Sequence, residues 1–226
     1  MNLDFSFVSE YMPYFINGIK STLLISLISV FLGVVFGSLL CFMKSSKFEI
    51  FKINPLKIIA SVYIEIMRGT PMLLQISIVY IAFDELLRIN MSALTAGIIA
   101  VSLNSAAYVS EIVRAGIEAV DKGQLEAARS LGMNQFKAMR LIIIPQAIRN
   151  ILPAIGNEFV TVIKESSMAS VIGVGELMYA AKVVRGKTFR GFEPLIVVAI
   201  FYFVLTFSLG RLINYLERRM KASDSR

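Results

Sequence analysis

Four polar side chains near the end of one apolar segment have the chemistry to bind a small zwitterion. Asn157, Thr161 and Lys164 are spaced i, i+4 and i+7, so a helix would present them on one face, with Glu158 one position around. An ammonium group can meet a carboxylate of the ligand, and a carboxylate can meet its amino group. The pattern predicts a binding site. The alternative is that Glu158 and Lys164 pair with other helices, or that Lys164 extends towards the membrane surface.

Most hydrolytic and metal chemistry is excluded by composition. The chain has no histidine, one cysteine and no tryptophan, which rules out histidine-based triads, zinc fingers and disulfide scaffolds. One near-match to a phosphate-binding loop, A-K-V-V-R-G-K-T at 181–188, lacks the first glycine and a preceding strand. We therefore expect no nucleotide site, no metal and no cofactor in this chain, and no enzymatic activity.

Three further apolar segments carry polar or small residues of interest. Glu65 and Arg68 are three residues apart and are expected to pair, with a gating role as the alternative, and the following Gly69-Thr70-Pro71 predicts a hinge or discontinuity. Asn104 can contact a ligand through its amide or hold helices together. Two glycines in a GxxxG pattern, at 33 and 37, predict close helix packing.

The elements that must position these residues are membrane helices. Of 226 residues, 56% are hydrophobic and only 17% charged, and the mean hydropathy is +0.70. The stretch 21–43 has no charged residue and would be about 34 Å long as a helix, enough to cross a bilayer. We predict a single all-α membrane domain over 1–226 with five transmembrane helices, at 16–43, 58–83, 89–116, 138–164 and 194–216.

The basic residues set the orientation. With the N-terminus outside and the C-terminus in the cytoplasm, sixteen of the 23 lysines and arginines lie inside. The net charge of +7 is thus explained by membrane orientation and not by binding of nucleic acid. The basic segment 182–190 opposes the rule, because this orientation puts it outside, and the apolar part of that connection, 168–181, is expected to lie on or dip into the membrane.

A short cytoplasmic helix is predicted between the third and fourth spans, at about 121–132. Residues 124–131 are good helix formers, Gly132 suits a left-handed C-terminal cap, and Asn134 can cap the next helix. Leu125, Ala128 and Leu131 are spaced to form one small apolar face. That face suits docking into a groove of a partner, and the alternative is that the helix packs on its own bundle.

Glu126-Ala127-Ala128 with Gly132, followed by I-I-I-P at 142–145, resembles the coupling-loop signature of bacterial ATP-binding-cassette (ABC) importer permeases. Further matches resemble the polar amino acid branch of that family. They comprise Glu65, Arg68 to Pro71, Gln75, Asn104 to Tyr108, Glu111, Arg114, Gly116, Ala119 to Val120, Gly123 to Gln124, Pro145 to Ala147 and Leu152-Pro153 to Asn157. The matching stretches cover 63–175.

The resemblance implies a type I importer permease of the bacterial inner membrane, which moves polar amino acids by alternating access. It implies as partners two ATPase subunits, which bind ATP and magnesium, a second permease subunit and an extracytoplasmic amino-acid-binding protein. Residues Glu126, Ala127, Ala128, Leu131 and Gly132 would then couple the permease to the ATPase. Glu65, Arg68, Gly69 and Pro71 would be structural or gating residues, and Asn104, Asn157, Glu158, Thr161 and Lys164 would line the substrate path.

Two other classes of function are considered. An ion-driven secondary transporter is disfavoured because no inverted repeat is visible and the short cytoplasmic helix would have no purpose. A membrane enzyme or assembly factor is disfavoured by the lack of histidine and of clustered carboxylates. Which amino acid is carried, and whether the two permease subunits are identical, stay open.

Overall fold

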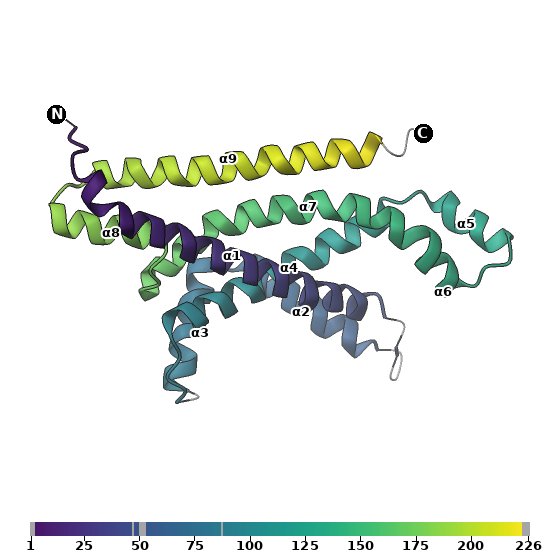
Figure 1. Ribbon diagram of the computed structural model, residues 1–226. Coiled ribbons are helices and arrows are strands. Elements are labelled where there is room, and N and C mark those ends of the chain that lie inside the picture. The colour runs from purple at the N-terminus through teal and green to yellow at the C-terminus, as the bar shows by residue number, and fades with distance from the viewer. Residues whose placement is uncertain (1–2, 47, 50–52, 87, 223–226) are drawn as a thin grey trace.

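A bundle of long helices makes up the protein (Figure 1), described by a computed structural model over residues 3–46, 48–49, 53–86 and 88–222. In chain order the helices are α1 (Val8–Lys44), α2 (Pro55–Gly69), α3 (Met72–Glu85), α4 (Ala93–Glu118), α5 (Lys122–Ser130), α6 (Gln135–Ala138), a π-helical turn (Met139–Ile143), α7 (Ile144–Glu165), a 3-10 helix (Ser166–Ile172), α8 (Leu177–Thr188) and α9 (Glu193–Ala222). Within these ranges, four helical runs are long and apolar enough to cross a membrane, and α2 with α3 would make a fifth.

The most extensive contact between helices joins α1 to α4, where both lie near the centre of the bundle (Figure 1). A β-carbon built at Gly33 would lie 2.7 Å from Ser105 Oγ, and one at Gly37 would lie 2.7 Å from the Ala106 carbonyl oxygen. No larger residue fits at either position unless the helices separate. The prediction of packing through the GxxxG pattern is confirmed.

The second apolar segment, predicted as a span over 58–83, is broken into two helices. α2 ends at Gly69 and α3 starts at Met72, with their axes bent by 112°. Thr70 is extended, at φ −119° and ψ 146°, as expected for the residue before a proline. The predicted discontinuity at Gly69-Thr70-Pro71 is therefore confirmed, and it is a sharp corner.

The apolar part of the connection between α7 and α9 is folded into the protein. Ala169 of the 3-10 helix and Val174 after it are buried in a core cluster with Ile25, Ile76 and Val101. α8 follows, and its buried residues pack against Phe15 of α1. The 181–188 segment that resembles a phosphate-binding loop lies entirely in helix α8, so it cannot form the loop that phosphate binding requires.

The start of α1 and the end of α9 lie at opposite ends of the bundle (Figure 1). α8 lies at the same end as the start of α1, whereas α5 and α6 extend from the other end, beyond the long helices. This arrangement is compatible with an odd number of membrane crossings.

Substitution of Gly37 by valine should destabilise the protein by about 1 to 3 kcal/mol, because the side chain would overpack the contact with Ala106 and Val109. The matched control is Gly210→Val in α9, where an added β-carbon meets no atom within 4 Å. Thermal unfolding in detergent, followed by size-exclusion chromatography, measures both. Equal midpoints for the two variants would contradict the assignment of Gly37 as a packing residue.

Candidate substrate path and coupling helix

Two side-chain amides close the corner between α2 and α3. Gln75 is only 7% exposed, and its Nε2 donates to the carbonyl oxygens of Met67 at 2.8 Å and Thr70 at 3.0 Å. Asn104 of α4 donates through Nδ2 to Gln75 Oε1 at 2.9 Å and to Met67 O at 3.2 Å. These bonds satisfy carbonyls that the broken helix leaves without partners. The structure therefore favours the helix-holding role for Asn104.

Gln75 is among the residues that carry the family resemblance, but its role at the α2–α3 corner is not among the sequence-based predictions. The signal for its role is a glutamine four residues after Pro71 in an otherwise apolar segment. A glutamine there reaches back to the carbonyls that precede the proline, which lack their usual donors.

Glu65 and Arg68 do not form the expected ion pair among the described residues. The guanidinium carbon of Arg68 lies 5.5 Å from the centroid of the Tyr108 ring on α4, a cation–π contact. Glu65 lines a separate hollow together with Asn54 and Lys57. The expectation of a pair is wrong because the ring of Tyr108 offers Arg68 a partner on the neighbouring helix.

The two charged residues of this set on α7, Glu158 and Lys164, face different neighbouring helices. Glu158 is partly buried and accepts a hydrogen bond of 3.1 Å from Ser105 Oγ of α4. Lys164 is exposed and lines a hollow of about 290 Å³ with Met178 of α8 and Tyr202 of α9, and Glu158 does not line it. The carboxylate and the ammonium group thus face different neighbours within one chain.

The remaining two candidates of this set flank Glu158. Asn157 is exposed and Thr161 is partly buried. None of the hydrogen bonds formed by described side chains engages either one, so both side chains are free to meet a ligand or another subunit.

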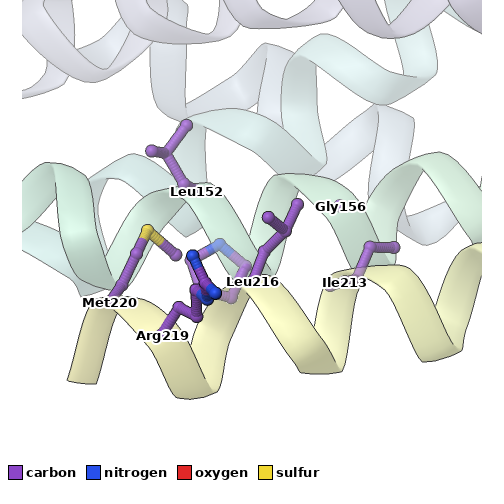
Figure 2. Close-up of a pocket in the computed structure, with 7 residues that line it drawn as sticks. Leu152, Gly156, Ile213, Leu216, Arg219 and Met220 are labelled. Atoms are coloured by element: carbon purple, nitrogen blue, oxygen red, sulfur yellow. The ribbon is translucent and has the colours of Figure 1, made fainter. Parts of the chain in front are cut away.

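An apolar hollow of about 560 Å³ lies between α7 and α9 (Figure 2). Its lining residues are apolar apart from one arginine near the end of α9: Leu152, Pro153, Gly156, Ile213, Leu216, Arg219 and Met220. Apart from Arg219, no lining residue could replace the hydration that a polar ligand would lose there, and the amino group of a zwitterion would stay unpaired. This hollow does not suit a zwitterion.

The cytoplasmic helix predicted at 121–132 is α5, and its ends are defined by specific bonds. The carboxylate of Asp121 accepts from the Gly123 amide at 2.7 Å at the start. At the end, Gly132 has φ +84°, and the amide of Met133 donates to Ala128 O at 3.1 Å. This is a Schellman cap, so the predicted left-handed role of Gly132 is confirmed.

The next cap is also as predicted. Asn134 Oδ1 accepts from the Lys137 amide at 2.8 Å, which starts α6. The turn between α5 and α6 is therefore fixed at both sides by local hydrogen bonds.

The predicted apolar face of α5 is divided between two surroundings. Ala128 is 4% exposed, and Leu125 packs beside a cluster that includes Val120 and Ile143. Leu131, by contrast, is 83% exposed. Leu125 and Ala128 thus follow the alternative reading, in which the helix packs on its own bundle, and only Leu131 of the predicted apolar face is free.

The outward face of α5 is formed by other residues. Glu126 and Ala127 are exposed, and Leu131 and Gly132 continue this surface at the end of the helix. Four of the five predicted coupling residues are thus accessible, and Ala128 is the exception.

Comparison with known proteins gives the family. Residues 50–222 match the family described as binding-protein-dependent transport system inner membrane component. The arginine transport system permease protein ArtQ of Bacillus subtilis is 42% identical over 99% of this chain and 100% of its own length. The putative glutamine transport system permease protein GlnP of Rickettsia bellii is 40% identical over 97% and 100%.

Solved structures agree. A crystal structure of an amino acid ABC transporter with histidines superposes with a TM-score of 0.91 at 47% identity, covering 97% of this chain and 100% of that one. An inward-facing MetNI methionine ABC transporter gives a TM-score of 0.77 at 18% identity, over 96% and 99%, which shows the shared fold.

The chain is therefore a membrane subunit of a binding-protein-dependent transporter. It belongs to the family of inner membrane components of such systems, with the all-helical fold of ABC importer permeases, and its role is transport and not enzymatic catalysis.

Replacement of Asn104 by leucine should lower stability by about 1 to 3 kcal/mol, because Gln75 Oε1 would lose its buried donor. Ser77→Ala is the control, since that hydroxyl donates only to Leu73 O of its own helix at 2.9 Å. Thermal unfolding of the purified variants measures the difference. An unchanged midpoint for Asn104→Leu would show that the α2–α3 corner does not depend on this amide.

Proposed function

We propose that this chain is the permease subunit of an ABC importer that moves polar amino acids into the cytoplasm. The observation that carries the proposal is α5, which extends beyond the long helices and leaves Glu126, Ala127 and Leu131 free for a partner (Figure 1). The names of the relatives, which include arginine and glutamine transport permeases, support an amino acid as substrate.

The proposed assembly has two ATPase subunits, a second permease subunit and an external amino-acid-binding protein. ATP and magnesium would bind to the ATPase partners. The N-terminus would lie outside and the C-terminus in the cytoplasm, which places α5 beside the ATPases and α8 outside. This follows from the distribution of lysine and arginine.

The proposed substrate path runs along α7 at the level of Glu158. This carboxylate has Ser105 as its hydrogen-bond partner, and Asn157 and Thr161 lie beside it. Insertion of a charged side chain into a membrane helix costs about 2.5 to 3.5 kcal/mol on insertion scales. The presence of Glu158 despite this cost favours a functional role. We assign it to the α-amino group or a cationic side chain of the substrate. Lys164 lies farther along α7 and would attract the carboxylate of an incoming amino acid.

Glu65, Arg68, Gly69 and Pro71 are proposed as structural and gating residues. The corner at Gly69–Pro71 separates two rigid helices, and Arg68 holds the end of α2 to α4 through Tyr108. A movement of α4 would therefore reach α2 and α3 together.

Uptake of labelled amino acids into proteoliposomes tests the function. We expect uptake only when the purified permease is combined with its ATPase, its binding protein and internal ATP. Uptake by the chain alone on an ion gradient would replace the importer with a secondary transporter.

Substitution of Gly132 by valine tests the coupling role of α5. A β-branched residue is strained at φ +84°, so the cap should distort while the membrane bundle stays intact, because no atom lies within 4 Å of the added β-carbon. Uptake and binding-protein-stimulated ATP hydrolysis should fall at least about tenfold. Gly132→Asn is the control, since asparagine tolerates the left-handed region. Normal uptake by the valine variant would remove this cap from the coupling mechanism.

Glu158→Gln tests the substrate path. Loss of the negative charge should weaken substrate affinity or change selectivity by about tenfold or more, without affecting ATPase association. Glu85→Gln makes the same change at an exposed position at the end of α3 and should have no effect. Competition assays with a panel of unlabelled amino acids measure both variants. Identical competition profiles for Glu158→Gln and the unaltered protein would exclude Glu158 from the site.

A further inference from the structure

The apolar hollow between α7 and α9 has a charged group at one end only. At the other end the two helices touch, since a β-carbon built at Gly156 would lie 2.9 Å from Ile213 Cγ1. Leu216 lies between the ends, and Arg219 lies at the end away from Gly156 and Ile213 (Figure 2). The hollow therefore suits an amphipathic occupant, with its apolar part along Leu216 and an anionic group at Arg219.

The guanidinium group of Arg219 is available to an anion. Its central carbon lies 5.3 Å from the centroid of the Tyr215 ring, one turn earlier in α9. Among the side chains that the structure describes, no carboxylate forms an ion pair with Arg219, and Glu217 does not line the hollow. The side chain of Arg219 is exposed. Because a guanidinium group carries several N–H donors in a fixed fork, it can bind two oxygen atoms of a phosphate.

The hollow lies at the depth where acyl chains meet headgroups. In α9 the stretch from Pro194 to Gly210 has no charged residue, and Arg219 follows Pro194 by 25 residues, which is about 38 Å along a helix. A hydrocarbon core of about 30 Å and one headgroup layer of about 5 to 7 Å together give about 35 to 37 Å. With Pro194 at the outer edge of the hydrocarbon, Arg219 is level with the inner headgroups. Ile213, at about 29 Å, is level with the inner ends of the acyl region.

The surroundings favour a lipid as the occupant. Only 11% of the apolar window of α9 is buried within the chain, so most of this helix is open to its surroundings. The volume of about 560 Å³ is within the range of about 300 to 1,000 Å³ of small-molecule sites. Basic pockets between membrane helices on the cytoplasmic side bind anionic headgroups. A phospholipid carries its phosphate and its apolar chain on one molecule, which matches both ends of this hollow.

We propose that the hollow between α7 and α9 binds one anionic phospholipid of the cytoplasmic leaflet, with its phosphate on Arg219 and its acyl chain along Leu216 towards Gly156. The lipid fills the space between the two helices and so holds the cytoplasmic end of α9 to α7. The assignment to the cytoplasmic leaflet rests on the proposed orientation. The binding itself depends on neither the orientation nor the transport function.

A single tryptophan in the hollow tests the proposal, because the chain has none of its own. The full chain with Leu216→Trp is placed in phosphatidylcholine nanodiscs that contain a small share of acyl-brominated phosphatidylglycerol or acyl-brominated phosphatidylcholine. Bromine quenches the fluorescence of a tryptophan that it touches. We expect phosphatidylglycerol to bind at least about fivefold more tightly than phosphatidylcholine, since one basic residue near an anionic headgroup contributes about 1 kcal/mol.

A second reporter guards against a folding defect. Leu152→Trp places the tryptophan on the α7 side of the hollow and should report the same preference as Leu216→Trp. Size-exclusion chromatography and the midpoint of thermal unfolding show whether each variant is folded.

Two arginine variants locate the headgroup. In the tryptophan background, Arg219→Gln should bring the affinities for the two brominated lipids to within about twofold of each other. Arg218→Gln is the matched control, because it removes the same charge from an exposed neighbour that does not line the hollow. This control should keep the preference for phosphatidylglycerol.

Three outcomes would overturn the proposal. Equal quenching by the two brominated lipids would show that the hollow does not select an anionic headgroup. An equal loss of preference in both arginine variants would show a diffuse basic surface in place of a site. No quenching by either lipid at both tryptophan positions would show that another part of the protein, such as a second subunit, closes the hollow. Each outcome leaves the proposed function untouched, because uptake into proteoliposomes is measured separately.

Discussion

The structure depends on the requirement that no backbone polar group stay unpaired inside a membrane. At Gly69-Thr70-Pro71 a 112° corner interrupts the helix and leaves carbonyls without their helical donors. Gln75 and Asn104 supply the missing donors from two different helices. The corner is therefore possible only while α4 stays in place, and so the position of α3 is tied to that of α4. The small residues between α1 and α4 fix the same helix from its other side. The positions of α1, α2 and α3 thus all depend on contacts with α4.

The short helix α5 shows how one sequence pattern serves two demands. Its apolar spacing supplies the contacts that attach it to the bundle through Leu125 and Ala128. The residues left facing outward, Glu126 and Ala127, are then accessible because they are not needed for attachment. Gly132 ends the helix without a side chain and leaves the turn open to a partner. The residues that attach α5 to the bundle and the residues that are open to a partner are therefore about half a turn apart around the helix.

Local features of this chain were predictable from the sequence, and features that depend on neighbours were not. Gly132, Asn134 and the break before Pro71 follow from backbone preferences that need no tertiary contact. The pairing of Glu65 with Arg68 failed because spacing along one helix says nothing of Tyr108 on another. The same limit applies to Lys164, which faces α8 and α9, and to the buried role of Gln75. Whether Asn157, Glu158 and Thr161 line the substrate path stays a prediction.

The length of α1 has a mechanical consequence. The helix is 37 residues long, so it exceeds the bilayer and carries α8 along its projecting end. It is also gripped by α4 at Gly33 and Gly37, roughly 28 Å from Tyr14. Its other end packs against α8, where a β-carbon built at Gly18 would lie 2.8 Å from Leu177 Cα. A tilt of about 5° about the α4 contact would therefore move the level of Tyr14, and α8 with it, by roughly 2.5 Å. α1 is in this sense a lever, with its fulcrum on α4 and α8 at the end of its longer arm.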